Sequence, residues 1–261
     1  MAYQSNVEFL ERVSDPMQGW LMPQAAIRTL DLLDWQVANG IRGGLLEIGV
    51  FCGKYFSLLL HSANAAGETI VGVDTFEFLP PEQVVDLLGR NGADSSRVQL
   101  LQRSSTDVTA ADIIDRLGTS ARFISVDGSH LKPDVLHDLR LSNDVLSDEG
   151  IIAADDFLNP VCLGVAEAIF EFLPANKSRI VPFAYITNKL LLCRPAMRDT
   201  YTRVLEAALL EHPFDAIGEQ FKARCEQDRK AAFTDLVGSP MLLVRGIPRS
   251  TLPAARRAGC G

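Results

Sequence analysis

Acidic residues and one histidine follow two apolar segments near the middle of the sequence. Asp127 and His130 lie in the stretch VDGSHLKPDV, and Asp155 and Asp156 end the later stretch GIIAADD. Three carboxylates at neighbouring strand ends would repel one another unless a cation lay between them. Mg²⁺ prefers carboxylate oxygens, so we expect Asp127, Asp155 and Asp156 to bind it. The alternative is that Asp155 and Asp156 cap the following loop through backbone N–H groups.

His130 is the candidate general base. A Gly-Ser turn after the strand would bring its ring back over the same edge of the sheet. A histidine side chain titrates near neutral pH and can take a proton from a hydroxyl. The alternative is a turn histidine bonded to a backbone carbonyl. We assign that structural role to His61, His137 and His212, because each lies in a helical pattern or a polar stretch.

The elements that must position these side chains alternate along the chain. Short apolar runs predict strands at 44–48, 69–74, 98–101, 121–126 and 150–154, and helical patterns cover 81–89, 108–117, 132–146 and 161–173. Continuous apolar strands separated by amphipathic helices indicate a parallel sheet covered on both faces. Two further strands, 179–185 and 189–193, flank a turn too short for a crossover helix and predict an antiparallel hairpin. The carboxyl ends of the parallel strands then share the edge where open α/β sheets bind ligands.

The two ends of the chain are predicted to be mostly helical. Residues 1–40 form a helical prefix, 41–195 the α/β core, and 196–261 a mostly helical extension with one short strand at 240–245 and a frayed tail from Arg249. The acceptor walls are expected at Trp20-Leu21-Met22 and Phe157–Pro160, although core packing is slightly favoured for the first group. An exposed apolar prefix helix could equally be a subunit interface, so a homo-oligomer is consistent with the sequence.

Composition excludes several classes of partner. The chain has 261 residues and a net charge of −8, which disfavours nucleic acid and anionic membranes. No apolar run has the ~20 residues that a membrane helix needs, and the N-terminus does not resemble a signal peptide. Five scattered cysteines without a CxxC spacing argue against structural zinc and favour reduced thiols in the cytoplasm.

A glycine turn follows the first predicted strand. Gly49 and Gly53 separate that strand from a helix, where a ligand can approach the backbone closely. Asp74, at the end of the second strand, can accept hydrogen bonds from both ribose hydroxyls. The G-x-G-x-x-G spacing is missing, which favours a nucleoside ligand without phosphates. Glu47 would repel a phosphate but could stabilise a cationic ligand.

The stretches EIGVFCG and VGVD resemble the first two motifs of class I S-adenosylmethionine-dependent methyltransferases. The resemblance covers residues 40–195 and implies a Rossmann-like, seven-stranded, mostly parallel sheet that ends in an antiparallel hairpin. It also implies a set of cofactor contacts. They are Glu47, Gly49 and Gly53 around the methionyl group, Asp74 on the ribose, and Ser105 near the adenine.

The D-G-S-H turn and the Asp155-Asp156 pair resemble one branch of that family, the macrocin and mycinamicin sugar O-methyltransferases and the cephalosporin-hydroxylase-type proteins. The metal-dependent members imply Mg²⁺ on Asp127, Asp155 and Asp156, and His130 as base. Ser129 departs from members that carry a second Asp in this turn. The expected function is O-methylation of a small-molecule hydroxyl, on a sugar or a glycosylated natural product.

Three other functions compete with this interpretation. An NAD-dependent oxidoreductase also uses a glycine turn and a strand-end acid, but it needs the phosphate-binding glycines. A non-catalytic binding module could retain the nucleoside fold, although all three acids are present. A metal-independent N- or O-methyltransferase keeps the same cofactor site.

Overall fold

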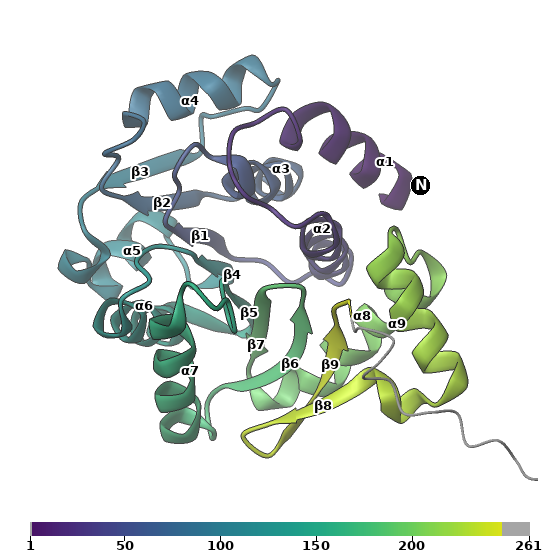
Figure 1. Ribbon diagram of the computed structural model, residues 1–261. Helices are drawn as coiled ribbons and strands as arrows, with labels where there is room; N and C mark the ends of the chain where they lie inside the picture. Colours follow the sequence, from purple (N-terminus) through teal and green to yellow (C-terminus); the bar gives the residue numbers. More distant parts are fainter. Residues whose placement is uncertain (1, 247–261) are drawn as a thin grey trace, which may run out of the picture.

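A twisted β-sheet runs through the molecule, and helices cover both of its faces (Figure 1). The computed structural model describes residues 2–246, and within them nine strands lie in the order β3-β2-β1-β4-β5-β7-β6-β9-β8. The strands are β1 (Gly44–Ile48), β2 (Ile70–Asp74), β3 (Val98–Gln102), β4 (Ala121–Val126), β5 (Leu146–Ala154), β6 (Val181–Ile186), β7 (Lys189–Cys193), β8 (Phe233–Leu236) and β9 (Ser239–Val244). The predicted tail from Arg249 lies outside the described residues.

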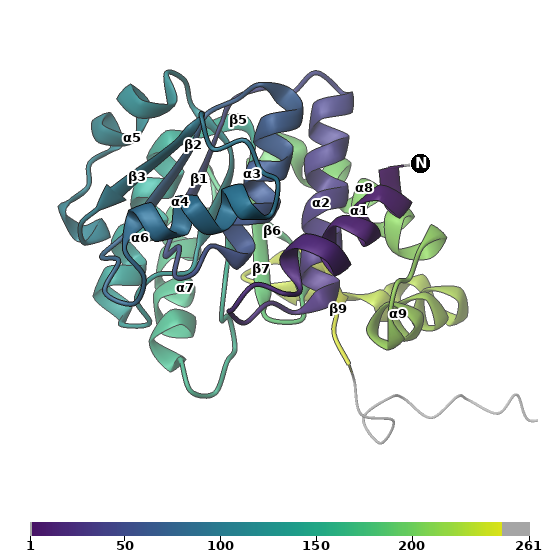
Figure 2. The same ribbon diagram turned by 90° about the horizontal axis from the view of Figure 1, so that it is seen from above.

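The helices form a layer on each side of the sheet (Figure 2). They are α1 (Ala2–Phe9), α2 (Pro23–Ala38), α3 (Lys54–Ala66), α4 (Pro81–Arg90), α5 (Ala110–Leu117), α6 (Lys132–Val145), α7 (Leu163–Asn176), α8 (Arg198–Glu211) and α9 (Ala216–Gln227). One core cluster joins α2, α3 and α8 through Leu30, Phe56 and Leu205. The other core lies against α6 and α7 and includes Leu139 and Ile169. Each strand of the middle of the sheet is therefore buried on both sides, as its continuous apolar sequence predicts.

The predicted mostly parallel sheet with an antiparallel hairpin is confirmed, but the predicted number of seven strands is too low. Strand β9 pairs in parallel with β6, and β8 pairs with β9 as a second hairpin. The strand expected at 240–245 is β9. Strand β8 was not predicted, because its four residues FTDL carry too short a pattern to distinguish a strand from a helix end.

The predicted division at residues 40 and 195 stays a prediction. Prefix helix α2 and extension helix α8 share one core cluster with the sheet. Among the described residues, no helix is both long and apolar enough to cross a membrane.

The direction of β7 decides which of its residues lies at the carboxyl ends of the parallel strands. Strands β1, β2, β4 and β5 are parallel, so their carboxyl ends meet along one edge. Strand β7 runs antiparallel to β5, with Leu190 opposite Ala154. The first residue of β7, Lys189, therefore lies at the carboxyl end of β5.

Arg122 joins the middle of the sheet to two helices. Its side chain is fully buried, and its guanidinium donates to Glu68 (2.7 Å), to Oε1 of Gln36 (2.9 Å) and to Oγ of Ser62 (2.9 Å). A buried ion pair is costly to break, because the remaining charge loses its partner.

Replacing Arg122 by Met should therefore destabilise the fold. We expect Arg122→Met to lower the free energy of unfolding by about 3–5 kcal/mol, because the Glu68 carboxylate is left without a cation. The control is Arg116→Met, which breaks a partly exposed pair with Asp112 and should cost less than about 1 kcal/mol. Urea unfolding measures both, and equal losses would contradict the prediction.

Candidate active site

The glycine turn connects β1 to α3 at the carboxyl edge of the sheet. Gly49 has a φ of 88°, and a Cβ on it would lie 2.0 Å from the carbonyl oxygen of Asp127. Gly53 has a φ of 82° and precedes the first turn of α3. Glycine is thus required at position 49 because the ends of β1 and β4 lie so close together. This packing reason is separate from the close approach of a ligand that the sequence suggested.

Asp74 organises this turn. Its Oδ2 accepts hydrogen bonds from the backbone N–H groups of Val50 and Phe51, both at 2.8 Å. Its Oδ1 accepts one from the N–H of Phe76 at 2.7 Å. The carboxylate is partly exposed, and Oδ1, which accepts one hydrogen bond, has a further lone pair. Its contact with a ribose stays a prediction, while its role in fixing the turn is visible.

Glu47 lies beneath the edge. Its side chain is 1% exposed, and Oε2 has no hydrogen-bond partner among the described residues. Burial raises the pKa of Glu47 well above its ordinary value, although the nearby Lys189 ammonium opposes the shift. Glu47 is thus buried in the folded chain, and its contact with a cofactor stays a prediction.

Ser105 begins the 3₁₀ turn Ser105–Asp107 after β3, close to Asp138 of α6. Asp138 is fully buried. Burial raises the pKa of Asp138 to about 6, while the Ser105 hydroxyl and His137 oppose the shift. The adenine contact expected of Ser105 stays a prediction.

The three acids predicted to bind Mg²⁺ separate into two groups. In the first, the ammonium of Lys189 lies 2.6 Å from Oδ2 of Asp155 and 4.0 Å from Oδ2 of Asp127. Oδ1 of Asp155 accepts hydrogen bonds from Nδ2 of Asn188 (2.6 Å) and from the backbone N–H of Asp156 (2.9 Å). Both oxygens of Asp155 therefore already contact donors.

Charge is distributed unevenly within this first group. Burial, reinforced by the charge of Asp155, raises the pKa of Asp127 well above its ordinary value. Burial would also raise the pKa of Asp155, but the Lys189 ammonium and the hydrogen bond with Asp127 outweigh it and lower that pKa. The pKa of Lys189 is raised by both carboxyl groups despite its burial. The arrangement is an ion pair of Lys189 and Asp155, with Asp127 beside it as the less acidic of the two carboxyl groups.

The second group is built around Asp156. Its Oδ2 lies 3.1 Å from Nε2 of His130 and accepts a weak hydrogen bond from Sγ of Cys162 (3.7 Å), while Oδ1 accepts from Nδ2 of Asn159 (2.8 Å). Asp156 has a φ of 55°, in the left-handed region. Gly164 allows α7 to approach, because a Cβ there would lie 2.5 Å from the carbonyl oxygen of His130.

These residues do not fit the predicted Mg²⁺ site. Mg²⁺ needs an octahedron of oxygen ligands, whereas Asp155 contacts an ammonium and Asp156 faces a different group. Within residues 2–246, the one group of His, Cys and acidic side chains close enough to share an ion is His130, Asp156 and Cys162, whose ligand atoms lie within 4.8 Å of one another. A nitrogen, oxygen and sulfur set suits Zn²⁺ better than Mg²⁺.

Residues 46–157 match the family Methyltransf_24, described as a methyltransferase domain. This segment is therefore similar to a methyltransferase domain. A search of curated proteins gives no significant match. The strand order and the antiparallel β7 agree with the class I methyltransferase fold that the sequence predicted.

Solved structures share the fold of this chain. The O-methyltransferase NovP aligns with a TM-score of 0.54 and 16% identity over 64% of this chain and 80% of NovP. Apo CalS11, a TDP-rhamnose 3'-O-methyltransferase of calicheamicin biosynthesis, has a TM-score of 0.54 and 18% identity, over 74% and 92% of the chains. Cofactor-bound Rv0187 from MTB has a TM-score of 0.50 and 15% identity, over 72% and 88%.

Exposed aromatic side chains lie beside the glycine turn that follows β1. Trp20, which is 89% exposed, stacks on Phe51 with ring centroids 5.8 Å apart, and Phe78, which is 80% exposed, meets Phe51 edge-on at 5.4 Å. Core packing was slightly favoured for the Trp20 segment, and for Trp20 that interpretation is wrong. The loop that connects α1 to α2 places its ring at the surface.

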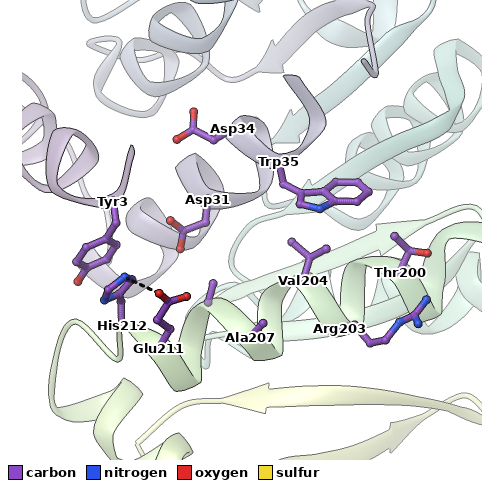
Figure 3. A pocket seen from close by; sticks show the side chains of 11 residues that line it. Tyr3, Asp31, Asp34, Trp35, Thr200, Arg203, Val204, Ala207, Glu211 and His212 are labelled. Atoms are coloured by element: carbon purple, nitrogen blue, oxygen red, sulfur yellow. Dashed lines mark ion pairs between the residues drawn. The ribbon is translucent and has the colours of Figure 1, made fainter. Parts of the chain in front are cut away.

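Two cavities differ in their relation to this edge. A narrow one of ≈ 10 Å³, room for about one water molecule, lies among Asp127, His130 and Asp155. A much larger one of ≈ 700 Å³ lies between α2 and α8, where Asp31 and Glu211 project into it (Figure 3). The predicted site residues all lie outside the larger cavity.

The sequence did not identify Lys189 as a site residue. The signal was present, however, because an antiparallel hairpin next to β5 must place the first residue of its second strand at the carboxyl end of β5. Asn188 and Lys189 contact Asp155 but lie outside the D-G-S-H and Asp155-Asp156 motifs, so these motifs alone did not predict them as site residues.

The buried Asp138 makes stability depend on pH. Its pKa is about 6 in the folded chain and ~3.9 when unfolded, so the unfolded state releases the proton first and stability falls as pH rises between these values. Asp138→Asn removes this effect. The free energy of unfolding of the variant minus that of the wild type should be larger at pH 8 than at pH 4, by up to about 3 kcal/mol. The variant is thus relatively more stable at the higher pH. Denaturant unfolding at both pH values checks this. With the exposed Asp115→Asn as control, a pH-independent difference for Asp138→Asn would contradict it.

Proposed function

We propose that this chain is an S-adenosylmethionine-dependent O-methyltransferase that acts on a hydroxyl of a small molecule, such as a sugar or a glycosylated natural product. The observation that carries the proposal is the contact between His130 and Asp156 at the carboxyl edge of a methyltransferase sheet, next to the glycine turn. NovP is an O-methyltransferase and CalS11 is a TDP-rhamnose 3'-O-methyltransferase. Their names support oxygen as the methylated atom and a sugar as the acceptor.

The glycine turn and Asp74 fit a nucleoside cofactor. Asp74 holds the backbone of Val50 and Phe51 in place while its carboxylate stays partly exposed. S-adenosylmethionine would supply a methyl group already activated on a sulfonium, so the protein has to position the acceptor and remove its proton.

His130 is suited to remove that proton. Its side chain is 48% exposed, so an acceptor hydroxyl can reach it, and Asp156 holds the ring at 3.1 Å. A carboxylate beside a catalytic imidazole fixes the orientation of the ring and stabilises the imidazolium that forms. The orientation of the proposed base thus depends on its contact with Asp156.

The aromatic group of Trp20, Phe51 and Phe78 is proposed as one wall of the acceptor site. Aromatic faces bind the apolar faces of sugars and aglycone rings. Leu158 and Val161, both exposed, lie in the loop after β5 and offer a second apolar surface. A mixed acceptor, with a hydroxyl directed to His130 and an apolar body between these surfaces, fits both features.

A metal-independent reaction is the form of this function that the geometry favours. The specific observation is the Lys189 ammonium between Asp127 and Asp155. The cytoplasmic location and the homo-oligomer expected from the sequence stay proposals.

The direct test is methyl transfer from labelled S-adenosylmethionine to a panel of sugars, glycosides and phenols. A labelled O-methyl product supports the proposal, and calorimetry with S-adenosylhomocysteine and NAD separates it from the oxidoreductase alternative. Binding of NAD without binding of S-adenosylhomocysteine would overturn it.

Loss of the base should reduce turnover strongly. We expect His130→Ala to lower kcat by about 10²–10⁴-fold, because the acceptor proton has no base to take it. Asp156→Asn should also lower kcat, because the His130 ring loses the carboxylate that orients it. His212→Gln is the matched control, because His212 stacks on Tyr3 far from the edge. Full activity in His130→Ala would remove the proposed base.

The aromatic wall should affect the acceptor and not the cofactor. Trp20→Ala removes a large exposed ring and should raise the KM for the acceptor about 5–10-fold, since a lost stacking contact of ~1 kcal/mol or more weakens binding. The KM for S-adenosylmethionine should change little. Steady-state kinetics with both substrates varied would show this. A change confined to the cofactor KM would place Trp20 in the wrong site.

A further inference from the structure

The carboxyl edge already contains a cation supplied by the protein. Lys189 lies at the start of β7, and its ammonium contacts Asp155 at 2.6 Å and Asp127 at 4.0 Å. These are two of the three acids for which the sequence predicts a divalent ion. The ammonium and that ion would need the same oxygen of Asp155.

Lys189 is buried and lies over an aromatic ring. The side chain is 2% exposed, and its ammonium lies 4.3 Å from the centre of the Tyr55 ring. Tyr55 is itself held by a 2.9 Å hydrogen bond with Thr29 of α2. A cation that entered beside Asp155 would have to move Lys189 out of this buried, aromatic environment.

The remaining oxygen of Asp155 is also engaged. Its Oδ1 accepts hydrogen bonds from Asn188 and from the backbone N–H of Asp156. Donors thus point at Asp155 from both sides, and a metal ligand would have to lose at least one of them. The same backbone N–H belongs to the residue that holds His130, so Asp155 connects Lys189 to the proposed base.

We infer that the Lys189 ammonium takes the place of a divalent cation at Asp127 and Asp155, and that methyl transfer by this chain needs no Mg²⁺ there. Lys189 is a positioning residue in this arrangement. Its charge holds Asp155, and the backbone of Asp156 then presents a carboxylate to His130. The part of the inference that concerns turnover rests on the proposed function, whereas the part that concerns metal binding does not.

The first experiment measures metal binding to the wild-type chain. Mn²⁺, a spectroscopic substitute for Mg²⁺, is titrated and followed by electron paramagnetic resonance. We expect no binding at Asp127 and Asp155, and methyl transfer that EDTA leaves unchanged. Mn²⁺ binding that Asp155→Asn abolishes would overturn the inference. Binding that survives Asp155→Asn but is lost in His130→Ala would belong to the separate group of His130, Asp156 and Cys162 and would agree with the inference.

The second experiment removes the charge of Lys189. Lys189→Met keeps the length of the side chain and leaves the two acids without a cation, so Mn²⁺ should bind at least about tenfold more tightly than to wild type. Its kcat should fall, and millimolar Mg²⁺ should restore part of it. Lys177→Met, at an exposed lysine after α7, is the control and should change neither quantity. If Lys189→Met folds but binds Mn²⁺ no more tightly than wild type, the inference that the Lys189 ammonium takes the place of a divalent cation is contradicted.

The two hypotheses fail in different ways. If no acceptor is methylated by the wild type, the proposed function fails, and the Mn²⁺ titrations still decide the inference. If circular dichroism shows that Lys189→Met does not fold, the wild-type titration with Asp155→Asn decides it alone.

Discussion

The ion pair between Lys189 and Asp155 is the contact on which the carboxyl edge of the sheet depends. It joins the beginning of β7 to the end of β5, and Asp127 at the end of β4 lies 4.0 Å from the same ammonium. Two neighbouring strand ends that both carry acidic groups repel each other unless their charge is neutralised. Here a buried lysine, packed on Tyr55, provides the neutralisation from within the fold. The edge is therefore ordered before any ligand binds.

This arrangement separates two tasks that one metal ion would otherwise combine. Asp127 and Asp155 hold the strand ends through Lys189, while Asp156 is free to hold His130. The two carboxylates contact different partners although Asp155 and Asp156 are adjacent in the sequence, and the backbone of Asp156 is left-handed, with a φ of 55°. Proton removal from a hydroxyl then falls to an oriented imidazole, and the glycine turn that Asp74 fixes remains available for the cofactor.

Much of the sheet could be predicted from the sequence, because its parallel strands are buried on both faces and are continuous apolar runs. The motifs also placed Asp127, His130, Asp155 and Asp156 correctly along one edge. Their partners could not be assigned from spacing alone, since Lys189 arrives through the antiparallel register of β7. The exposure of Trp20 depends on the path of a loop, and β8 is too short to carry a pattern. Contacts between distant segments decided these features, and local sequence did not.

The central claim is that a protein ammonium, and not a metal ion, neutralises this edge. A crystal structure of the chain grown with Mn²⁺ and S-adenosylhomocysteine, with anomalous data collected at the manganese edge, tests it most directly. The account predicts no anomalous peak between Asp127 and Asp155, and the Lys189 ammonium within hydrogen-bond distance of Asp155. A peak between those two carboxylates, with Lys189 turned away from them, would contradict it.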